Sequence, residues 1–446
     1  MIVAKFGGTS CATPARIKTL CQIIVSGVKK EPVVVVVSAI AGVTDLLLEC
    51  ASGIKVASNI AKIRQIHLAL ARRVFSNKAL YGEFTSYLDA NLDEVRKLAR
   101  RKNGDRSDRD RIVSYGEIVS SYFVAEALRQ AGVDAQQVTA DRLIVTNNNF
   151  GVAEFLPSST KKKVIRNLLP LIKAQKVAVV TGFIGATTKG QITTLGRGGS
   201  DYSASIIGYC LRAREIQIWT DVDGIFSADP RIVKHAKLLA QISFSEASEI
   251  AAFGAKVLHP RTIRPAVAKN IPVRVLNTFN PKGPGTLILE KAVNSEPISA
   301  ISCKKKLVLV NIYSSEMLFS KGFLVKIFGV FSRHNISIDL VSVSEVSVSV
   351  TLDNEDGLSE SVAEISKFAT VGVKKGLGSI SLVGEGIATS SKTIKRIFEI
   401  LDKCGILVRM VSLGATDINV SLVVQYDQVE DGVRALHRGL IAQRSK

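Results

Sequence analysis

The chain has 446 residues and a formal charge of +20, with 46% hydrophobic and 22% charged residues, a composition typical of globular domains rather than disordered chains. This length predicts two or three domains, each large enough to bury its own core. The six cysteines include no CxxC pair, which argues against a disulfide framework or a thiolate zinc site and favours a reducing compartment.

The N-terminal residues predict a buried strand rather than a targeting segment. Met1–Ser10 lacks the charged and apolar regions of a signal peptide, and its apolar run Ile2–Phe6 ends at two glycines. The longest apolar run, Val33–Val37 extended through Ile40, is far shorter than the roughly 18–20 residues that cross a membrane. We therefore expect a soluble, cytoplasmic protein with no membrane partner.

The densest basic stretch, Arg96–Arg111, holds eight Lys and Arg residues together with three Asp and no aromatic residue. Proteins that stack nucleic-acid bases place aromatic side chains beside their cations. A solvated helix end and loop is therefore favoured over a nucleic-acid partner, and Lys161–Lys163 is interpreted in the same way, as the exposed start of a helix. Residues 1–295 hold 41 Lys+Arg against 23 Asp+Glu, which indicates a general attraction for small anions in this region.

Up to about residue 290, short apolar runs alternate with helical stretches. The predicted strands are Ile2–Phe6, Val33–Ser38, Val177–Thr181, Glu215–Thr220 and Val273–Leu276, and the clearest helices are Ile112–Ala131 and Ser200–Arg212. Strands that are apolar on both faces and separated by helices are typical of a mainly parallel sheet covered on both sides. Ligands of such sheets bind at the carboxyl ends of the strands, where glycine-rich turns fall in this sequence.

The segment Asn280–Pro297 is rich in Pro, Gly and Asn and marks a domain boundary. Beyond it the pattern changes to two strand–helix–strand–strand units. The first comprises Leu307–Tyr313, Phe323–His334, Ser337–Ser342 and Val346–Leu352, and the second Ser379–Val383, Lys392–Cys404, Leu407–Ser412 and Asn419–Val424. An internal repeat of about 75 residues is typical of paired ferredoxin-like modules, with two unrelated α+β hairpins as the alternative.

Four motifs in the N-terminal region combine glycines with charged or hydroxyl side chains. They are KFGGTS (Lys5–Ser10), LGRGGSD (Leu195–Asp201), TDVDG followed by DPR (Thr220–Gly224 and Asp229–Arg231), and FGAKVLHP (Phe253–Pro260). Glycine frees backbone N–H groups to surround a phosphate, and lysine or arginine neutralises its charge. The motifs together predict an anion site at the strand ends.

Each motif also has a purely structural interpretation. Lys5 could lie on a tight turn, Asp201 could be an N-cap, and Asp223-Gly224 could be a plain turn. His259, which precedes a proline, is expected to be structural rather than a catalytic base. The sequence has no Gly-Lys dipeptide, no HRD or DFG motif, no GxGxxG and no His/Cys metal spacing. A nucleotide enzyme with this sequence would use another phosphoryl-transfer fold.

Taken together, several motifs resemble the aspartate kinases, and they occur in that family's order over nearly the whole chain. They are KFGGTS, SAIAGVTD (Ser38–Asp45), SYGE (Ser114–Glu117), TLGRGGSDYSA (Thr194–Ala204), WTDVDGIFSADPR (Trp219–Arg231) and FGAKVLHP. The resemblance implies an α/β fold, namely a three-layer αβα amino-acid-kinase domain with a mainly parallel sheet over residues 1–295. Residues 296–446 would form a regulatory region of two α+β ferredoxin-like ACT domains.

The resemblance also implies the boundaries of the ACT domains. Ser315–Asp353 is similar to the first ACT domain of the lysine-sensitive monofunctional type. The first ACT domain would span about residues 314–383. The second would be discontinuous and would combine about 298–313 with 384–446.

The resemblance assigns the catalytic and substrate-binding residues by position. Lys5 would neutralise the transferred γ-phosphoryl group, and Asp201 would orient the phosphate-binding lysines. L-aspartate would be bound by Thr44, Glu117, Arg197 and Ser200. Glu117 would pair with the α-ammonium group, and Arg197 would bind a carboxylate through two parallel hydrogen bonds.

ATP and Mg²⁺ are the implied cofactors, with Mg²⁺ bridging the β- and γ-phosphates and no dedicated protein metal site. The implied ATP-binding residues are Lys5, Phe6, Gly7, Gly8, Thr220, Asp221, Phe226, Arg231, Lys256 and Val257. The family often has tyrosine where this chain has Phe226. Phenylalanine has no hydroxyl group, so a hydrogen bond near the nucleotide is in doubt at this position. Its aromatic ring keeps the stacking surface.

The resemblance implies feedback inhibition by lysine through the ACT domains and a homodimer or larger assembly formed by them. The implied lysine-binding residues are Met317, Ser320, Phe323, Leu324, Ile338, Asp339, Ser344 and Glu345. Asp339 and Glu345 would pair with the two ammonium groups of lysine. Without the resemblance, both would be interpreted as exposed acids at strand ends.

We therefore expect an ATP-dependent kinase that converts the β-carboxylate of L-aspartate to an acyl phosphate. This reaction is the first step towards lysine, threonine and methionine. Two alternatives remain: a kinase of the same fold for another carboxylate, such as glutamate or acetylglutamate, and an ACT-based amino-acid sensor with an inactive kinase domain. The SYGE and GRGGSDY motifs and the ACT pair argue against the first, and the presence of every candidate catalytic residue argues against the second.

Overall fold

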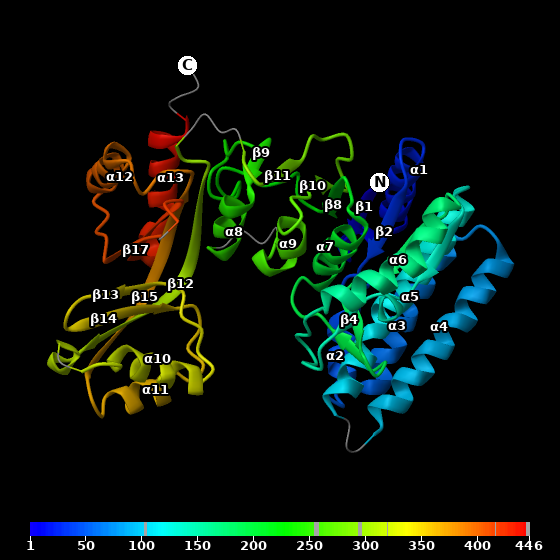
Figure 1. The fold of residues 1–446 in the computed structure, drawn as a ribbon, viewed down its shortest axis with the longest axis horizontal. Helices are drawn as coiled ribbons and strands as arrows, with labels where there is room; N and C mark the ends of the chain where they lie inside the picture. The colour runs from blue at the N-terminus through cyan, green and yellow to red at the C-terminus, as the bar shows by residue number, and fades with distance from the viewer. Residues whose placement is uncertain (102–104, 254–257, 293–296, 319, 415, 443–446) are drawn as a thin grey trace. The chain divides into compact units, whose positions relative to one another are not determined.

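The computed structural model describes residues 1–101, 105–253, 258–292, 297–318, 320–414 and 416–442, which form two compact units (Figure 1). The first unit comprises Met1–Ile225, Ala240–Phe244 and Val257–Ala292. The second comprises Phe226–Leu239, Ser245–Lys256 and Val293–Lys446. Two segments that precede the expected boundary in sequence thus group with the C-terminal part of the chain. Residues 293–296 of the predicted boundary lie outside the described residues.

The first unit contains a mainly parallel sheet with the strand order β3-β5-β2-β1-β8-β10-β11-β9. Its strands are β1 (Ile2–Phe6), β2 (Val33–Val37), β3 (Ala135–Val138), β5 (Val177–Thr181), β8 (Glu215–Thr220), β9 (Gln241–Ser243), β10 (Val273–Asn277) and β11 (Thr286–Leu289). β10 and β11 are antiparallel, and a small separate sheet holds β4 (Val145–Thr146), β6 (Ile184–Thr187) and β7 (Ile192–Thr194). The predicted parallel sheet is confirmed.

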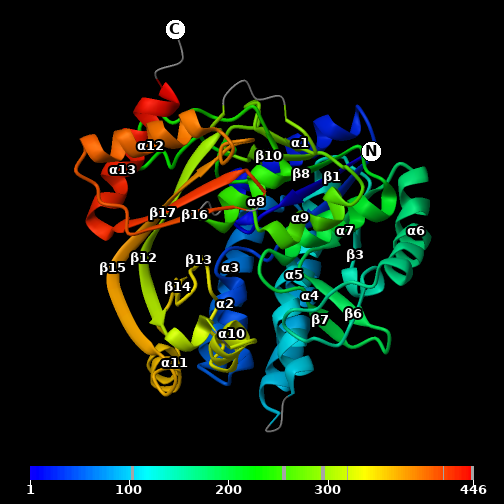
Figure 2. The same cartoon turned by 60° about the vertical axis from the view of Figure 1, so that its left-hand side comes forward.

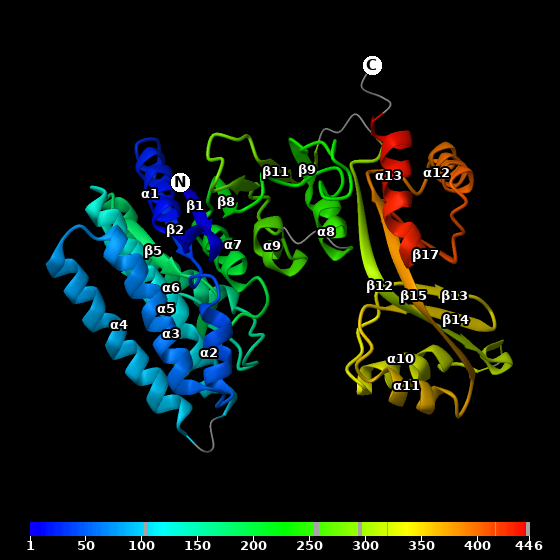
Figure 3. The same cartoon turned by 180° about the vertical axis from the view of Figure 1, so that it is seen from behind.

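Helices cover both faces of this sheet, which gives the predicted three layers (Figure 3). One face packs against α1 (Pro14–Val28) and α5 (Arg106–Gln130), with α2 (Val43–Ala51), α3 (Val56–Val74) and α4 (Lys78–Ala99) beside them. The other face packs against α6 (Pro157–Lys173) and α7 (Gly199–Leu211), and α9 (Pro260–Val267) packs on α7. Ile2, Ala4 and Phe6 share the first of these two cores, as the period-2 alternation of a strand requires.

The basic run Arg96–Arg111 ends α4 and begins α5, which confirms the prediction of exposed helix ends, although residues 102–104 lie outside the described residues. Helix α5 begins six residues earlier than predicted. Its N-cap Asp105 accepts hydrogen bonds from the backbone N–H groups of Ser107 and Asp108. The first turn of α5 is polar, so the spacing of apolar residues does not reveal where the helix starts.

A buried histidine in α3 gives the first unit a built-in sensitivity to acid. His67 is 1% exposed, its Nδ1 lies 2.8 Å from the carbonyl oxygen of Ile63, and its Nε2 has no hydrogen-bond partner among the described residues. Burial lowers the pKa of His67 to about 4, with a small opposing effect from the hydrogen bond to Ile63. The folded protein therefore holds His67 neutral in the Nδ1–H form.

We expect acid to destabilise the fold through His67. Because its folded pKa is depressed, the stabilising contribution is complete above the unfolded pKa of about 6.5 and is lost as pH falls towards 4. Between pH 7.5 and 5 this loss should be about 2 kcal/mol in the free energy of unfolding. In urea unfolding at the two pH values, His67→Leu should lose about 2 kcal/mol less than the wild type. Equal losses in the two proteins would contradict this assignment.

The second unit contains a sheet with the order β13-β14-β12-β15-β17-β16. Its strands are β12 (Ala300–Tyr313), β13 (Val341–Val343), β14 (Ser347–Leu352), β15 (Thr370–Val383), β16 (Met410–Leu413) and β17 (Asn419–Gln425). Its helices are α8 (Phe244–Ala252), most of which groups with this unit, α10 (Phe323–Arg333), α11 (Leu358–Ile365), α12 (Ser391–Lys403) and α13 (Val429–Leu440). Figure 2 shows β12 and β15 as long strands that run from the α12–α13 end of the sheet to the α10–α11 end.

The two ends of this sheet have separate cores, as the internal repeat predicts. One core lies under α10 and α11, and the other lies under α12 and α13. The ladder between β12 and β15 shifts register near Lys306, whose φ is +65°, and Gly376, whose φ is +72°. The two halves of each long strand thus serve different cores. Among the described residues, every helix is too short or too polar to span a lipid bilayer.

Candidate active site

The carboxyl ends of neighbouring parallel strands bring three of the predicted segments and the turn after β5 together. β1 leads into Gly7-Gly8, β2 into Ser38–Ala41, β5 into Gly182-Phe183 and β8 into Thr220–Asp223. β1 pairs with both β2 and β8, and β2 pairs with β5, so these turns lie along one edge of the sheet. The edge is the place where open parallel sheets bind ligands.

Lys5 at the end of β1 is held by a carboxylate from α7. Its side chain is buried, and its Nζ lies 2.6 Å from Oδ1 of Asp201 in the first turn of α7. The ring of the next residue, Phe6, stacks on Trp219 of β8 with a centroid separation of 5.8 Å. Asp201 therefore holds the Lys5 ammonium group at the strand end, and the predicted pair of catalytic residues is brought together.

Gly8 is required by the close approach of the loop that follows β2. A Cβ atom at Gly8 would lie 2.5 Å from the carbonyl oxygen of Ala39, and the Gly8 carbonyl accepts a hydrogen bond from Ala41 N. The turn after β1 consequently lies directly against the start of the SAIAGVTD motif. Thr44, in the first turn of α2, is half-buried close to this loop in the chain.

Glu117 is a buried carboxyl group with one unused oxygen. It lies on α5 and is 3% exposed, and its Oε1 accepts a hydrogen bond from Ala39 N at 3.2 Å. Its Oε2 is buried without a hydrogen-bond partner among the described residues. Burial raises the pKa of Glu117 to about 8, opposed by the hydrogen bond from Ala39. An unpartnered buried carboxyl oxygen beside the phosphate-type turn is suited to receive an ammonium group.

The start of α7 places the remaining predicted aspartate-binding residues. Gly196 and Gly198 adopt φ values of +78° and +70°, so the loop can turn sharply before the helix. Ser200 is buried against Gly182, where a Cβ atom would lie 2.5 Å from its Oγ. Arg197 is exposed and forms no ion pair with any described residue. Its guanidinium group is thus available for a carboxylate.

Phe183 is a site residue that the sequence alone did not identify. Its φ is +67°, which is costly for an aromatic residue, and its ring lies where a side chain on Gly199 would be, with Cδ2 2.6 Å from the ideal Cβ position. Its backbone N–H donates to Ser203 Oγ, and its carbonyl accepts from Leu195 N. These contacts fix the ring beside the start of α7. A strained non-glycine residue cannot be recognised from sequence pattern.

The turn after β8 carries the predicted nucleoside-binding residues. Thr220 Oγ1 donates to Asp221 Oδ1 at 3.1 Å, and the Thr220 carbonyl accepts from Thr278 N. Asp223 Oδ1 accepts hydrogen bonds from the side-chain amides of Asn277 and Asn280. The two asparagines, which brace the acidic turn, were missed by sequence analysis. Asn277 ends β10, one residue beyond the predicted strand, and Asn280 begins the segment interpreted only as a boundary.

The other predicted nucleotide residues belong to the second unit or fall outside the described residues. Phe226 and Arg231 belong to the second unit, where Phe226 forms a β-bridge with Leu238 and exposed Arg231 pairs with Asp229 at 2.6 Å. Lys256 and Val257 lie outside the described residues. His259 caps α9, its Nδ1 accepting a hydrogen bond from Arg261 N at 3.3 Å, which agrees with the expected structural role.

Three of the predicted lysine-binding residues share one core of the second unit. Met317, Phe323 and Ile338 share the core under α10 and α11, with Ser320 and Leu324 beside Phe323 in the chain. Asp339 Oδ1 lies 2.9 Å from Lys304 Nζ, whereas its Oδ2 is buried without a hydrogen-bond partner among the described residues.

Ser344 and Glu345 follow β13. Ser344 Oγ lies 2.7 Å from Ser347 Oγ, and Glu345 is exposed and forms no ion pair with a described residue. Asp339 and Glu345 flank β13, Asp339 before its first residue and Glu345 after its last.

The second unit also joins the segment after the TDVDG motif to the C-terminal helix. Ser227 Oγ lies 2.9 Å from Nε2 of His437 on α13, and the Ser227 carbonyl accepts from Ile301 N at the start of β12. Both side chains are buried. No local sequence pattern predicts this contact, because its partners are 210 residues apart.

Comparison with known proteins relates this geometry to a family. The amino acid kinase family matches residues 1–277, and an ACT domain matches residues 380–440. The chain is 36% identical to lysine-sensitive aspartokinase 3 of Escherichia coli, covering 99% of both chains. It is also 36% identical to chloroplastic aspartokinase 1 of Arabidopsis thaliana, covering 98% of this chain and 79% of that protein.

Solved structures agree in fold. Escherichia coli aspartokinase III in complex with aspartate and ADP superposes with a TM-score of 0.84 at 35% identity, covering 99% of both chains. The Clostridium acetobutylicum aspartate kinase superposes with a TM-score of 0.82 at 26% identity, covering 99% of this chain and 100% of that one. With the kinase fold, the ACT domain and the strand-end site all present, the chain belongs to the aspartokinase family.

Proposed function

We propose that this protein transfers the γ-phosphoryl group of ATP to the β-carboxylate of L-aspartate and forms 4-phospho-L-aspartate. The observation that carries the proposal is the unpartnered Oε2 of Glu117, which lies buried on the strand edge that also holds the Lys5–Asp201 pair. An ammonium-binding carboxyl group beside a phosphate-binding turn suits a substrate with an amino group and a nearby carboxylate. The full-length similarity to aspartokinases supports the same substrate.

In this proposal the protein contributes position and charge rather than covalent chemistry, as is general for phosphoryl transfer. The N–H groups of Gly7 and Gly8 surround the phosphates, and Lys5 neutralises the charge that develops on the transferred group. Asp201 keeps the Lys5 ammonium group in place through their 2.6 Å ion pair. The β-carboxylate attacks the γ-phosphorus directly and in line, ADP leaves, and no phospho-enzyme forms.

Aspartate is bound in the proposal by groups of opposite charge on facing elements. Glu117 accepts the α-ammonium group on its free oxygen, and Arg197 binds the α-carboxylate. Thr44 and Ser200 supply hydroxyl groups for hydrogen bonds to the substrate. This arrangement leaves the β-carboxylate free to attack the phosphate.

ATP would be bound through Thr220 and Asp221, with Phe226, Arg231, Lys256 and Val257 as further proposed contacts. Among the described residues, no three His, Cys, Asp or Glu side chains form a group able to hold a metal ion. In the proposal the nucleotide phosphates are the main ligands of Mg²⁺, because this ion keeps several waters and needs few protein ligands. When bound, Mg²⁺ supplies charge neutralisation between the β- and γ-phosphates.

The proposal predicts strict amino-acid selectivity in a coupled assay of ADP release. L-aspartate should support turnover, and glutamate and acetylglutamate should not. Turnover with glutamate but not aspartate would identify another carboxylate kinase of this fold. No turnover with any amino acid would favour the sensor alternative.

We further propose that lysine inhibits the enzyme through the second unit, which would contain two ACT domains with the boundaries predicted above and would pair with another copy of the chain. Asp339 Oδ2 has no hydrogen-bond partner among the described residues and Glu345 is exposed, which supports a site for two ammonium groups. Exposed apolar side chains on β13 and β16, namely Val341, Val343, Val411 and Leu413, support self-association. The buried Ser227–His437 contact supports transmission of the effect of lysine binding to the TDVDG segment. Ser227 lies three residues after Gly224, which ends that segment.

If this site is correct, Glu345→Ala should raise the lysine concentration for half-inhibition about tenfold, because an ammonium group loses its partner. The kinetic constants without lysine should stay unchanged. Asp356→Asn, which removes an exposed acid from the turn between β14 and α11, is the matched control and should leave inhibition unchanged. Unaltered inhibition of the Glu345 variant would place the effector site elsewhere.

A further inference from the structure

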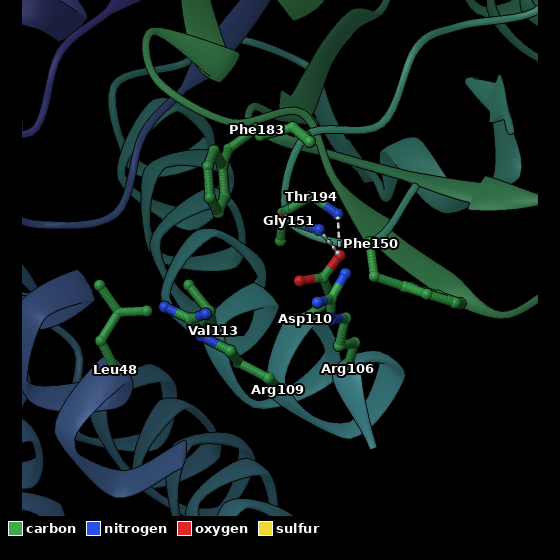
Figure 4. Close-up of a pocket in the computed structure, with 10 residues that line it drawn as sticks. Leu48, Arg106, Arg109, Asp110, Val113, Phe150, Gly151, Phe183 and Thr194 are labelled. Atoms are coloured by element: carbon green, nitrogen blue, oxygen red, sulfur yellow. Dashed lines mark hydrogen bonds between the residues drawn. The ribbon is translucent and has the colours of Figure 1, made fainter. Parts of the chain in front are cut away.

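A pocket of about 350 Å³ lies in the first unit between α2, α5 and the turns that follow β4 and β5 (Figure 4). Its volume is at the lower end of the range for small-molecule sites. The lining residues are Leu48, Arg106, Arg109, Asp110, Val113, Phe150, Gly151, Val152, Phe183 and Thr194. None of the roles proposed above uses the charged members of this set.

The pocket adjoins the proposed aspartate site on three sides. Val113 lies one helical turn before Glu117 on the same face of α5, and Leu48 lies one turn after Thr44 on α2. The Phe183 ring packs against the start of α7 at Gly199, next to the aspartate-binding Ser200. A ligand that enters through this pocket therefore arrives at the residues that would bind aspartate.

The charged side chains of the pocket have different roles. Asp110 is buried, and its Oδ2 accepts hydrogen bonds from Gly151 N at 2.8 Å and Thr194 N at 2.7 Å, as Figure 4 shows. Burial raises the pKa of Asp110, while these hydrogen bonds and the charge of Arg109 lower it. Asp110 thus serves to hold the wall of the pocket in place. Arg106 and Arg109 are exposed, and neither forms an ion pair within the part of the chain that the structure describes.

The guanidinium group of Arg109 lies between apolar side chains that line the pocket. Figure 4 shows its guanidinium group beside Val113 and turned towards Leu48, on the side of the pocket that the Phe183 ring also faces. Apolar walls of this kind exclude water and focus the field of a charge across a cleft. A cation that lay merely on a solvated helix end would have no such walls.

We infer that Arg109 is a substrate-capture residue, which attracts and orients the dicarboxylate at the mouth of the pocket before Arg197 and Glu117 bind it. Arg106, one turn earlier on α5, adds to the same positive field. The inference rests on the proposed function, because it takes aspartate as the ligand of the adjoining site. It gives a role to part of the basic run Arg96–Arg111, whose composition alone predicted only solvated charges.

The test is steady-state kinetics of the full-length enzyme at low and high ionic strength. For Arg109→Ala, the KM for aspartate should rise about 3- to 10-fold at low salt, with kcat and the KM for ATP unchanged, since capture contributes equally to ground and transition states. The difference from wild type should shrink at about 0.5 M salt, where the Debye length falls to a few ångströms. Arg109→Lys keeps the charge and should retain most of the wild-type affinity.

Lys162→Ala is the matched control, because it removes one exposed cation of α6 that pairs with no described residue and does not line the pocket. Its KM for aspartate should equal that of the wild type. An unchanged KM in Arg109→Ala, an equal rise in Lys162→Ala, or a fall in kcat without a change in KM would each overturn the inference. Absence of aspartate-dependent turnover in the wild type would instead overturn the proposed function itself.

Discussion

Replacing Lys5 with alanine should lower kcat by at least about 10³-fold, because the γ-phosphoryl group would lose the cation that is proposed to neutralise its charge. The Lys5 side chain is buried at the end of β1 and pairs with Asp201, so its position is fixed before substrate arrives. Aspartate-dependent ADP release at saturating ATP and aspartate measures this loss.

The single substitution leaves Asp201 without its cation, which could weaken the fold as well as the chemistry. The double variant Lys5→Ala/Asp201→Asn removes both charges and separates the two effects. Circular dichroism and thermal unfolding should show a folded double variant that is as inactive as the single one. Near-wild-type turnover in a folded Lys5 variant would contradict the assigned role.

Replacing Glu117 with glutamine should raise the KM for aspartate about 100-fold, because the substrate ammonium group would lose a desolvated carboxylate partner. In the wild type, Glu117 Oε1 accepts a hydrogen bond from Ala39 N at 3.2 Å. The side-chain oxygen of glutamine can accept the same hydrogen bond. The loop after β2 should therefore keep its position, and thermal unfolding should change little. A change of less than twofold in KM would show that aspartate does not use this group.

Glu117 also makes a prediction about pH. Burial raises its pKa to about 8, so the group is protonated in the free enzyme at neutral pH. An ammonium group binds the ionised form, so aspartate binding must release a proton. The affinity for aspartate should therefore rise up to about tenfold per pH unit between pH 6 and 8 and level off above 8. In Glu117→Gln this dependence should disappear, and an equally steep profile in that variant would assign it to another group.

The buried parallel strands could be predicted from sequence because their physical signal is strong. Ile2–Phe6, Val177–Thr181 and Glu215–Thr220 were predicted with the bounds that the structure has. A strand covered on both faces is a short apolar run bounded by turns, which few other structures produce. The position of Lys5 follows from the same logic, since it lies near the carboxyl end of β1. Asp201 does not, because it lies in the first turn of α7, which follows β7 of the small separate sheet.

The long strands of the second unit could not be predicted in full. β12 was expected to begin at Leu307 and β15 at Ser379, whereas they begin at Ala300 and Thr370. Lysines near residue 305 and a glycine at 376 interrupt the alternation of apolar residues where the two cores meet. An alternating apolar pattern predicts a strand that packs against one core, whereas β12 and β15 each pack against two.

Long-range contacts were also beyond a pattern-based prediction. The Ser227–His437 contact, the strained Phe183 and the brace of Asp223 by Asn277 depend on where distant segments meet. Each of these residues is ordinary in its local sequence. Glu117 has a predicted role only through the resemblance to a family, whereas Arg197 also belongs to the LGRGGSD motif.

The most direct test of the account is to identify the acyl phosphate. The enzyme would be incubated with ATP, Mg²⁺ and L-aspartate labelled with ¹⁸O in both β-carboxylate oxygens, and the product would be trapped with hydroxylamine. Attack at the acyl carbon breaks the carbon–oxygen bond, so the account predicts β-aspartyl hydroxamate and inorganic phosphate that carries one ¹⁸O atom. The α-hydroxamate, unlabelled phosphate, or ADP formed without any hydroxamate would contradict it.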